Sequence, residues 1–314
     1  MKRAYELSNV SLPTLFVVAC FSFGLIVGCS NDARKSAELA KAGWKSLADD
    51  FDFQNAEECF NKALELNSDN DLAYTGLGQV SLQRQDFENA EKYFTKALAI
   101  DPQCFQALDG RGESRLGLRR YEEAVADFDA ALKIMPDVGA VHSHRGYAYA
   151  YLGELDKALD DLNKCVEAFP NKASYLVNRG VLFQKRQEYD SALSDLSQAI
   201  SLEPNNAMNY AIRGKICEDA GNWDAALEDY NAALDIDADC FPALKYRGIH
   251  FKNLSEWEEA LKDLTRALGI DPNDAGTYFE RSVVYRQLGK EDESKADLEK
   301  ARELDPRSVP TSEI

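Results

Sequence analysis

The chain has 314 residues, of which 45% are hydrophobic and only 9 are proline, so it carries enough apolar surface to fold and has no long disordered tract. Its formal net charge at pH 7 is −18. An acidic balance of this size repels nucleic-acid phosphates and anionic lipid head groups, which disfavours both as general partners, and solubility is the plain reason for such a charge.

The N-terminal segment is an apolar stretch, LPTLFVVACFSFGLIV over 12–27, behind a basic start. A basic start, an apolar run and a small residue before a cleavage point predict a secretory signal peptide over 1–28. The run ends in IVGC, which resembles the lipobox of bacterial lipoproteins. The resemblance implies that Cys29 is diacylated. Serine rather than aspartate after the cysteine resembles the sorting signal of lipoproteins that are placed in the outer membrane and face the periplasm. An uncleaved membrane anchor and a plain signal peptide are the alternatives.

From Ala37 onward one 34-residue pattern repeats without insertion, and we number its positions as slots 1 to 34. Slot 8 is Gly in six units, slots 20 and 27 are Ala in seven units each, and slot 32 is Pro in six. A short tether over 29–36 precedes the repeats and a tail over 309–314 follows them. The eight units are 37–70, 71–104, 105–138, 139–172, 173–206, 207–240, 241–274 and 275–308.

Each unit holds two apolar patterns with helical spacing, separated by a polar turn such as Gln187-Glu188. The small residues of slots 8 and 20 let two antiparallel helices approach closely. Proline in slot 32 disfavours helical backbone at the residue before it and so separates the units. One hairpin cannot bury its apolar face alone, whereas stacked hairpins form a continuous core.

The period and these residue types resemble the tetratricopeptide repeat over 37–308. The resemblance implies an all-α fold, a right-handed α-solenoid of about eight helix-turn-helix repeats. Both ends depart from the pattern. The first unit has Trp44 in slot 8 with Gly43 beside it, and the highly charged second helix of the last unit, 291–304, is interpreted as a polar cap.

Slots 7 and 23 carry a paired feature. Slot 7, usually Leu in this family, is Arg in six units, and slot 23 is Asp in the same six. Because the two residues are present or absent together, we predict a ladder of structural ion pairs, within one unit or across adjacent units. The alternative is an arginine row that binds anionic ligands. The ladder consists of Arg111 and Asp127, Arg145 and Asp161, Arg179 and Asp195, Arg213 and Asp229, Arg247 and Asp263, and Arg281 and Asp297.

In tetratricopeptide solenoids the first helices line the concave face, which places slots 2, 5, 9, 12 and 13 in a groove. Exposed aromatic side chains there predict an apolar anchor, and the lysines predict a locally basic stretch toward the C-terminus. We expect a protein or peptide segment as the partner, and the alternative is an ordinary solvated inner surface. The candidate groove residues are His144, Tyr147, Tyr151, Val177, Val181, Gln184, Lys185, Lys215, Lys245, Lys252 and Arg286.

Motifs for chemistry are missing from the sequence. His142 and His144 are two residues apart on a helix and so point to different sides, which makes them poor joint metal ligands. No nucleophile elbow, phosphate-cradling loop or zincin motif occurs. We therefore expect no enzymatic activity, no cofactor and no metal.

Together these features favour a membrane-anchored, non-enzymatic interaction scaffold on the extracytoplasmic side of the cell envelope. The alternative is an assembly or adaptor lipoprotein that recruits envelope enzymes, pilus components or secretion components.

Overall fold

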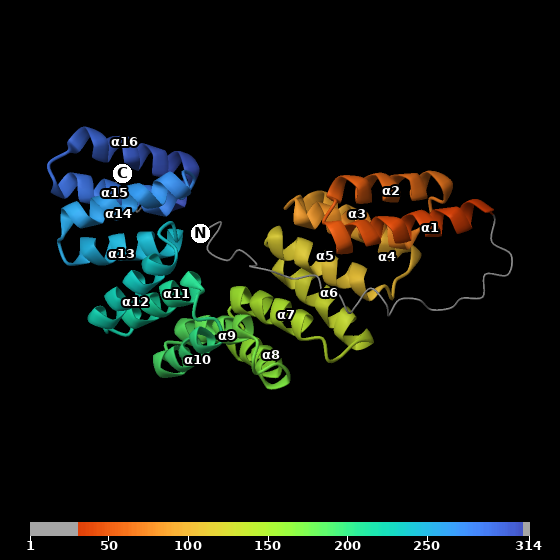
Figure 1. Cartoon of the computed structure of the whole chain (residues 1–314), viewed down its shortest axis with the longest axis horizontal. Helices are drawn as coiled ribbons and strands as arrows, with labels where there is room; N and C mark the ends of the chain where they lie inside the picture. The colour runs from red at the N-terminus through yellow and green to blue at the C-terminus, as the bar shows by residue number, and fades with distance from the viewer. Residues whose placement is uncertain (1–30, 310–314) are drawn as a thin grey trace. The chain divides into compact units, whose positions relative to one another are not determined.

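The computed structural model describes residues 31–309, and over this range the chain is all-helical and has no strand (Figure 1). The helices follow one another in consecutive packed pairs, which confirms the predicted α-solenoid class. None of the helices described is both long and apolar enough to span a bilayer. The predicted signal peptide and Cys29 lie outside the described residues.

The described helices fall into two compact halves, 31–169 and 170–309. The N-terminal half contains α1 (Asn31–Lys45), α2 (Phe53–Leu66), α3 (Asp71–Gln83), α4 (Phe87–Ile100), α5 (Phe105–Gly117), α6 (Tyr121–Ile134), α7 (Gly139–Leu152) and α8 (Leu155–Ala168). The C-terminal half contains α9 (Ala173–Lys185), α10 (Tyr189–Leu202), α11 (Ala207–Asp219), α12 (Trp223–Ile236), α13 (Phe241–Asn253), α14 (Trp257–Ile270), α15 (Ala275–Gln287) and α16 (Glu291–Leu304).

Odd-numbered helices are the first helices of their units, and even-numbered helices are the second. In each half a first helix packs against the second helix of its own unit and against the first helix of the next unit, as α3 does with α4 and α5. Among the helices described, no second helix packs against another second helix. The first helices are therefore the more closely spaced layer and form the inner face of each half, as the family resemblance implies.

The two helices of each unit are joined through one residue with left-handed backbone, always in slot 15. In the fifth unit the N–H of Glu188 donates to the carbonyl of Phe183 and the N–H of Gln187 to that of Gln184, both at 2.9 Å. This Schellman arrangement satisfies carbonyls that the helix end leaves open. The slot-15 residues are Phe51, Gln85, Arg119, Gly153, Gln187, Gly221, Ser255 and Gly289.

Glycine in slot 8 makes room for the large side chain in slot 24 of the same unit. A Cβ atom on Gly78 would lie 2.7 Å from Phe94 Cε1, and one on Gly112 would lie 2.4 Å from Phe128 Cε1. Slot 6 of the third unit is also glycine, and a Cβ on Gly110 would lie 2.3 Å from Phe94 Cζ. The fully buried Phe94 ring thus packs between glycines of two consecutive units and joins them.

We expect the stability effect of replacing a slot-8 glycine to depend on the side chain in slot 24 of the same unit. Gly112→Ala should lower the free energy of unfolding by ~1–3 kcal/mol, because the methyl group overlaps the Phe128 ring. Gly146→Ala should be nearly neutral: its Cβ would be 3.3 Å from Leu162 Cγ, and alanine favours a helix by up to about 1 kcal/mol over glycine. Urea denaturation of both variants, followed by circular dichroism, tests this. Equal losses would contradict it.

The first unit obeys the same rule with a shifted register. Gly43, in slot 7, takes the place of the slot-8 glycine, because a Cβ on it would lie 2.7 Å from Phe60 Cε1. Trp44 points elsewhere, with its indole N–H donating to the carbonyl of Leu72 at 3.2 Å. The π-helical turn η1 (Ser46–Asp50) absorbs the extra residue before the second helix begins.

The start of the first unit also differs from the sequence expectation. Helix α1 begins at Asn31, so residues 31–36, assigned from the sequence to a tether, are helical. Ser36 is buried, and its hydroxyl donates to the carbonyl of Ala63 at 2.6 Å. This extra turn belongs to the helix because it packs against the second helix of the unit.

The C-terminal helix α16 spans the range predicted for the polar cap, 291–304. A 3-10 turn, η2 (Pro306–Ser308), follows it, and the Ser308 hydroxyl donates to the carbonyl of Ala301 at 3.2 Å. Val309, which the sequence analysis placed in the tail, is buried. The cap therefore consists of a charged helix together with a short turn that packs back onto it.

Candidate partner-binding face

The arginine of slot 7 binds the aspartate of slot 23 in the same unit. In all six pairs Nε donates to one carboxylate oxygen and Nη2 to the other, at 2.6–3.0 Å. The aspartate side chains are 2–9% exposed. The structure thus brings together Arg111 with Asp127, Arg145 with Asp161, Arg179 with Asp195, Arg213 with Asp229, Arg247 with Asp263, and Arg281 with Asp297.

The third guanidinium nitrogen, Nη1, contacts the preceding unit in at least four of the pairs. Its acceptor is always in slot 25: Arg145 donates to Asp129, Arg213 to Ser197, Arg247 to Asn231 and Arg281 to Thr265, at 2.5–3.3 Å. The carboxylate contact lies within a unit and the Nη1 contact lies between units, a division that the sequence left open. These contacts favour the structural role of the arginines over an anion-binding row.

The charge state of the arginines in the ladder follows from these contacts. The hydrogen bond to Asp161 is the main reason that the pKa of Arg145 is raised, and the hydrogen bond to Asp229 does the same for Arg213. Bidentate, charge-assisted pairs of this kind fix the geometry of both partners. The first helices are therefore held against the second helices in a defined orientation before any partner binds.

An aromatic patch, which we define as Tyr121, Tyr147 and Tyr151, joins the inner face of the N-terminal half to the start of the second helix α6. Tyr147 and Tyr151 occupy slots 9 and 13 of α7 and are 36% and 49% exposed. Their hydroxyl oxygens are 3.1 Å apart, and Tyr151 stacks on Tyr121 with ring centroids 4.8 Å apart. The patch is a preformed apolar surface with polar edges, as protein interfaces favour.

Tyr121 was missed by the sequence analysis. It is the first residue of α6, in slot 17 of the third unit. Burial is the main reason that the pKa of its hydroxyl is raised, and Tyr151 adds to the effect. The sequence feature that could have indicated its place in the patch is Tyr151, the aromatic residue in slot 13 of the following unit, because the two rings stack.

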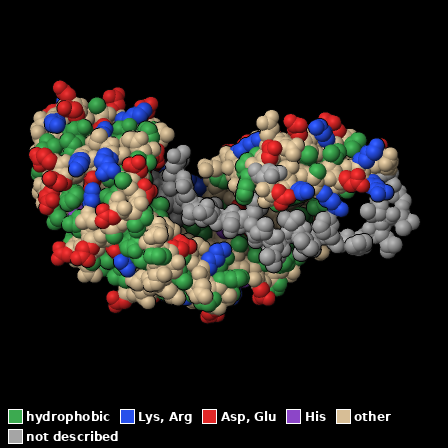
Figure 2. All heavy atoms as spheres, viewed as in Figure 1, with side chains coloured by type: hydrophobic (Ala, Val, Ile, Leu, Met, Phe, Trp, Pro, Cys, Tyr) green, Lys and Arg blue, Asp and Glu red, His purple; other side chains and the backbone are tan. Residues whose placement is uncertain are grey.

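The lysines of the C-terminal half do not form a free basic surface. Lys245 Nζ donates at 2.7 Å to Asp274, which caps the first helix of the following unit, and Lys252 Nζ donates at 2.6 Å to Glu280 of that helix. Lys215 pairs with Asp219 one turn along α11. On the face shown in Figure 2, basic and acidic side chains are intermixed over this half. The expectation of a locally basic groove is therefore corrected, because neighbouring carboxylates compensate these lysines.

Asp274 illustrates that compensation. Burial would raise the pKa of its carboxyl group, but the charge of Lys245 and the hydrogen bonds from Lys245 and Thr277 together lower it. The carboxylate is thus ionised at neutral pH and already bound to Lys245 and Thr277. An acidic partner would have to compete with Asp274 for Lys245.

The remaining candidates on the inner face of the C-terminal half have different surroundings. Val177 is half-buried and packs against the core of Ala192, Leu196 and Ile216. Gln184 donates to Asp219 at 2.6 Å. Val181 and Arg286 are half-buried, and Lys185 is exposed.

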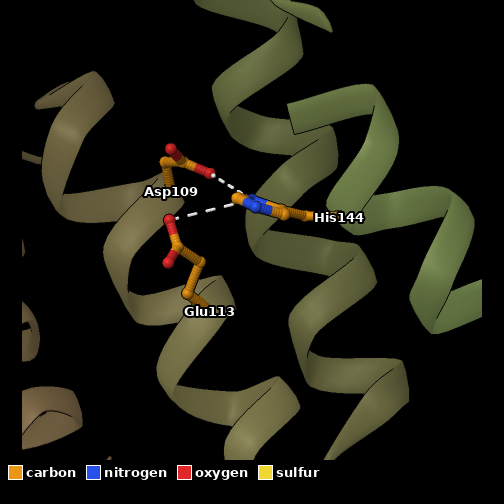
Figure 3. Close-up of side chains that lie close together, drawn as sticks. All are labelled: Asp109, Glu113 and His144. Carbon is orange, nitrogen blue, oxygen red and sulfur yellow. Dashed lines mark hydrogen bonds and ion pairs between the residues drawn. The ribbon is translucent and has the colours of Figure 1, made fainter. Parts of the chain in front are cut away.

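His144 is not presented to a partner as expected, because only 8% of it is exposed. Figure 3 shows its ring directed at Asp109 and Glu113 of α5. The distances from His144 Nδ1 are 3.5 Å to Asp109 Oδ1 and 3.7 Å to Glu113 Oε1. We call these three residues the acid–histidine cluster. Sequence analysis missed it because the acids lie in slots 5 and 9 of one unit and the histidine in slot 6 of the next.

Glu113 has a strongly shifted pKa. Burial raises the pKa to about 7, opposed by the charge of His144 and increased by that of Asp109. The folded state therefore binds a proton more tightly than the unfolded chain does. The stability that the folded state gains by binding this proton is fully present below about pH 4.5, the ordinary pKa of a glutamate. It is lost as the pH rises through about 7.

The pH dependence can be tested with a neutral replacement. In metal-free buffer, Glu113→Gln should raise the free energy of unfolding at pH 8 by ~1–3 kcal/mol, because it removes an unfavourable half-buried charge. At pH 5 the variant and the wild type should be similarly stable, because the wild-type carboxyl group is then neutral. Thermal unfolding at both pH values is the measurement. If the variant were instead less stable than the wild type by the same amount at both pH values, the neighbours of Glu113 would be stabilising its carboxylate.

The geometry described above defines a class of protein: a solenoid of 34-residue helical hairpins with an inner face made by the first helices. Family profiles of the tetratricopeptide repeat match residues 45–103, 110–173, 177–239 and 275–308. The chain belongs to the tetratricopeptide repeat family. No curated protein matches the chain.

Several solved structures share the fold. A tetratricopeptide repeat protein from Parabacteroides merdae has a TM-score of 0.69 and 20% identity, covering 80% of this chain and 99% of its own. Yeast Tom70 has a TM-score of 0.66 and 19% identity, with coverage of 88% and 61%. The hetero-tetramer of Cut9 and Hcn1 gives a TM-score of 0.61 and 17% identity, with coverage of 81% and 53%. At these identities the likeness concerns the fold alone.

Proposed function

We propose that the chain is a non-enzymatic scaffold that binds a peptide or protein segment on the inner face of its first helices. The observation that carries the proposal is the aromatic patch, since Tyr147 and Tyr151 expose large apolar area on a face held rigid by the ion-pair ladder. A preformed surface loses little conformational freedom on binding, which favours affinity.

Two further points support this role. Tetratricopeptide repeat proteins are generally non-enzymatic scaffolds. Cut9, whose fold is similar, occurs in a hetero-tetramer with Hcn1. The compensated lysines argue that apolar contact, rather than recognition of an acidic segment, supplies most of the binding energy.

Affinity capture from solubilised membranes tests the scaffold role. The wild type, the Tyr147→Ala/Tyr151→Ala variant and the control Trp223→Ala should be compared. Trp223 is 41% exposed, like the two tyrosines, but it begins the second helix α12. We expect the partner to be retained by the wild type and the control and lost by the double variant. Equal capture by all three would remove the aromatic patch from the binding site.

We further propose that the scaffold is tethered to the outer membrane and faces the periplasm through a lipid on Cys29. The support is the sequence alone: an apolar run that ends in IVGC over 26–29. A single acyl chain binds a membrane only weakly, so stable anchoring usually needs two membrane-binding groups. Diacylation supplies two acyl chains. The lipid would restrict where a partner is assembled, whereas the acidic body would stay in water.

Labelling with a palmitate analogue tests the anchor. We expect the wild type to be labelled and to fractionate with membranes, and Cys29→Ala to be unlabelled. Label on the Cys29→Ala chain, or none on the wild type, would contradict lipidation. Partner capture is a separate readout, because the scaffold role does not depend on the lipid. An adaptor that recruits envelope enzymes, pilus components or secretion components is the alternative, and the identity of a captured partner distinguishes it.

A further inference from the structure

The acid–histidine cluster has the composition of a metal-binding site. Asp109 and Glu113 are one turn apart on α5, and His144 faces them from α7. Their candidate ligand atoms all lie within 4.8 Å of one another. Two carboxylate oxygens and one imidazole nitrogen form a ligand set that suits Zn²⁺ and neighbouring divalent transition metals.

The two distances from His144 are close to those expected around a bound ion. Ligand atoms about 2.0–2.2 Å from Zn²⁺ lie roughly 3–3.6 Å from one another. The two distances from His144 Nδ1, 3.5 and 3.7 Å, are at or just above this range. Small rotations of the two carboxylates would complete the contact, and both residues are half-buried on the rigid helix α5.

The local charge also favours a cation. The charged groups that act most strongly on Glu113 are His144 and Asp109. Two carboxyl groups therefore share a half-buried position with one imidazole, whereas the nearby aspartates of the ladder each have a bidentate arginine. A divalent ion would supply the missing positive charge.

The cluster is particular to one place in the repeats. In the preceding pair of units slots 5 and 9 are Thr75 and Gln79, and slot 6 of the next unit is Gly110. A histidine in slot 6 takes the place of the glycine that admits a ring in the two preceding units, and its ring centroid lies 5.8 Å from that of Phe128. This local departure puts a nitrogen donor opposite two acids.

We propose that Asp109, Glu113 and His144 bind one divalent transition-metal ion, with Zn²⁺ as the representative. Three protein ligands leave one tetrahedral position for water or another small ligand. His144 lies one helical turn before Tyr147, so the ion would sit beside the aromatic patch. The site adds a ligand to the inner face that the scaffold role does not require.

Metal titration of the full-length chain tests the proposal. The chain should be purified through a tag without histidine, stripped with chelator and titrated with Zn²⁺ by calorimetry and with Co²⁺ by visible absorption. We expect one ion per chain. Asp109→Asn, Glu113→Gln and His144→Asn should each weaken Zn²⁺ binding more than ~100-fold, beyond the loss typical of an outer-shell partner.

The matched control is Glu218→Gln. Glu218 also faces a histidine, with its Oε1 3.8 Å from His250 Nδ1, but the described residues place no second acid there that could complete a metal-binding group. This variant should bind Zn²⁺ as the wild type does, and circular dichroism should show that all variants are folded. Absence of saturable binding by the wild type would overturn the proposal. So would binding that persists in the three ligand variants, which would place the ion on other residues.

Discussion

Asp229→Ala is expected to lower the free energy of unfolding by ~3–5 kcal/mol, because it leaves the half-buried guanidinium of Arg213 without its carboxylate. In the wild type Arg213 donates to both oxygens of Asp229, at 2.9 and 2.7 Å, and only 9% of the Asp229 side chain is exposed. Urea denaturation followed by circular dichroism measures the loss. Glu228→Ala is the control, since Glu228 is the adjacent acid on α12 and is exposed.

A double-mutant cycle separates the pair from the single losses. Arg213→Ala should cost a similar amount, because it leaves the Asp229 carboxylate unpaired. The double variant should lose clearly less than the sum, with a coupling of ~1–3 kcal/mol. Simple additivity of the two losses would mean that the two side chains do not stabilise each other.

Phe94→Ala is expected to cost ~3–5 kcal/mol, because the ring is fully buried and its loss leaves a cavity. The cavity would lie between Gly78 and Gly110, two backbone positions on adjacent first helices that cannot collapse onto each other easily. The loss should therefore affect the packing between the second and third units as well as within one unit.

The control for this variant is Tyr151→Ala, which removes an aromatic side chain that is 49% exposed in the same half. Its effect on the free energy of unfolding should be small, which also qualifies it as a binding variant. Thermal and urea denaturation of both variants provide the comparison. If Phe94→Ala cost no more than Tyr151→Ala, the slot-24 ring would not be what holds consecutive units together.

The sequence predicts the fold well because each unit repeats the same packing problem. A glycine in slot 8 and a ring in slot 24 recur at one spacing, and the paired presence of Arg179 and Asp195 already indicates their contact. Exceptions are harder to predict. The role of Gly43 in place of Trp44 depends on a π-helical turn, which no local pattern announces.

The candidate site is less predictable because its contacts join residues that are far apart in the sequence. Lys245 reads as a free cation in the sequence, but its partner Asp274 is 29 residues away, and the pairing depends on how α13 and α15 stack. His144 reads as a groove residue, although the acids of α5 turn it inward. The slot of a residue defines the helix face that it occupies. The packing of adjacent units decides whether its side chain is exposed to a partner.

Site-specific photo-crosslinking tests the partner-binding face most directly. A photoreactive phenylalanine derivative should replace Tyr151 on the first helix α7 in one chain and Trp223 on the second helix α12 in another, and both should be irradiated in intact cells. We expect an adduct with one partner from position 151 and none from position 223. An adduct from position 223 with none from position 151 would contradict binding on the inner face.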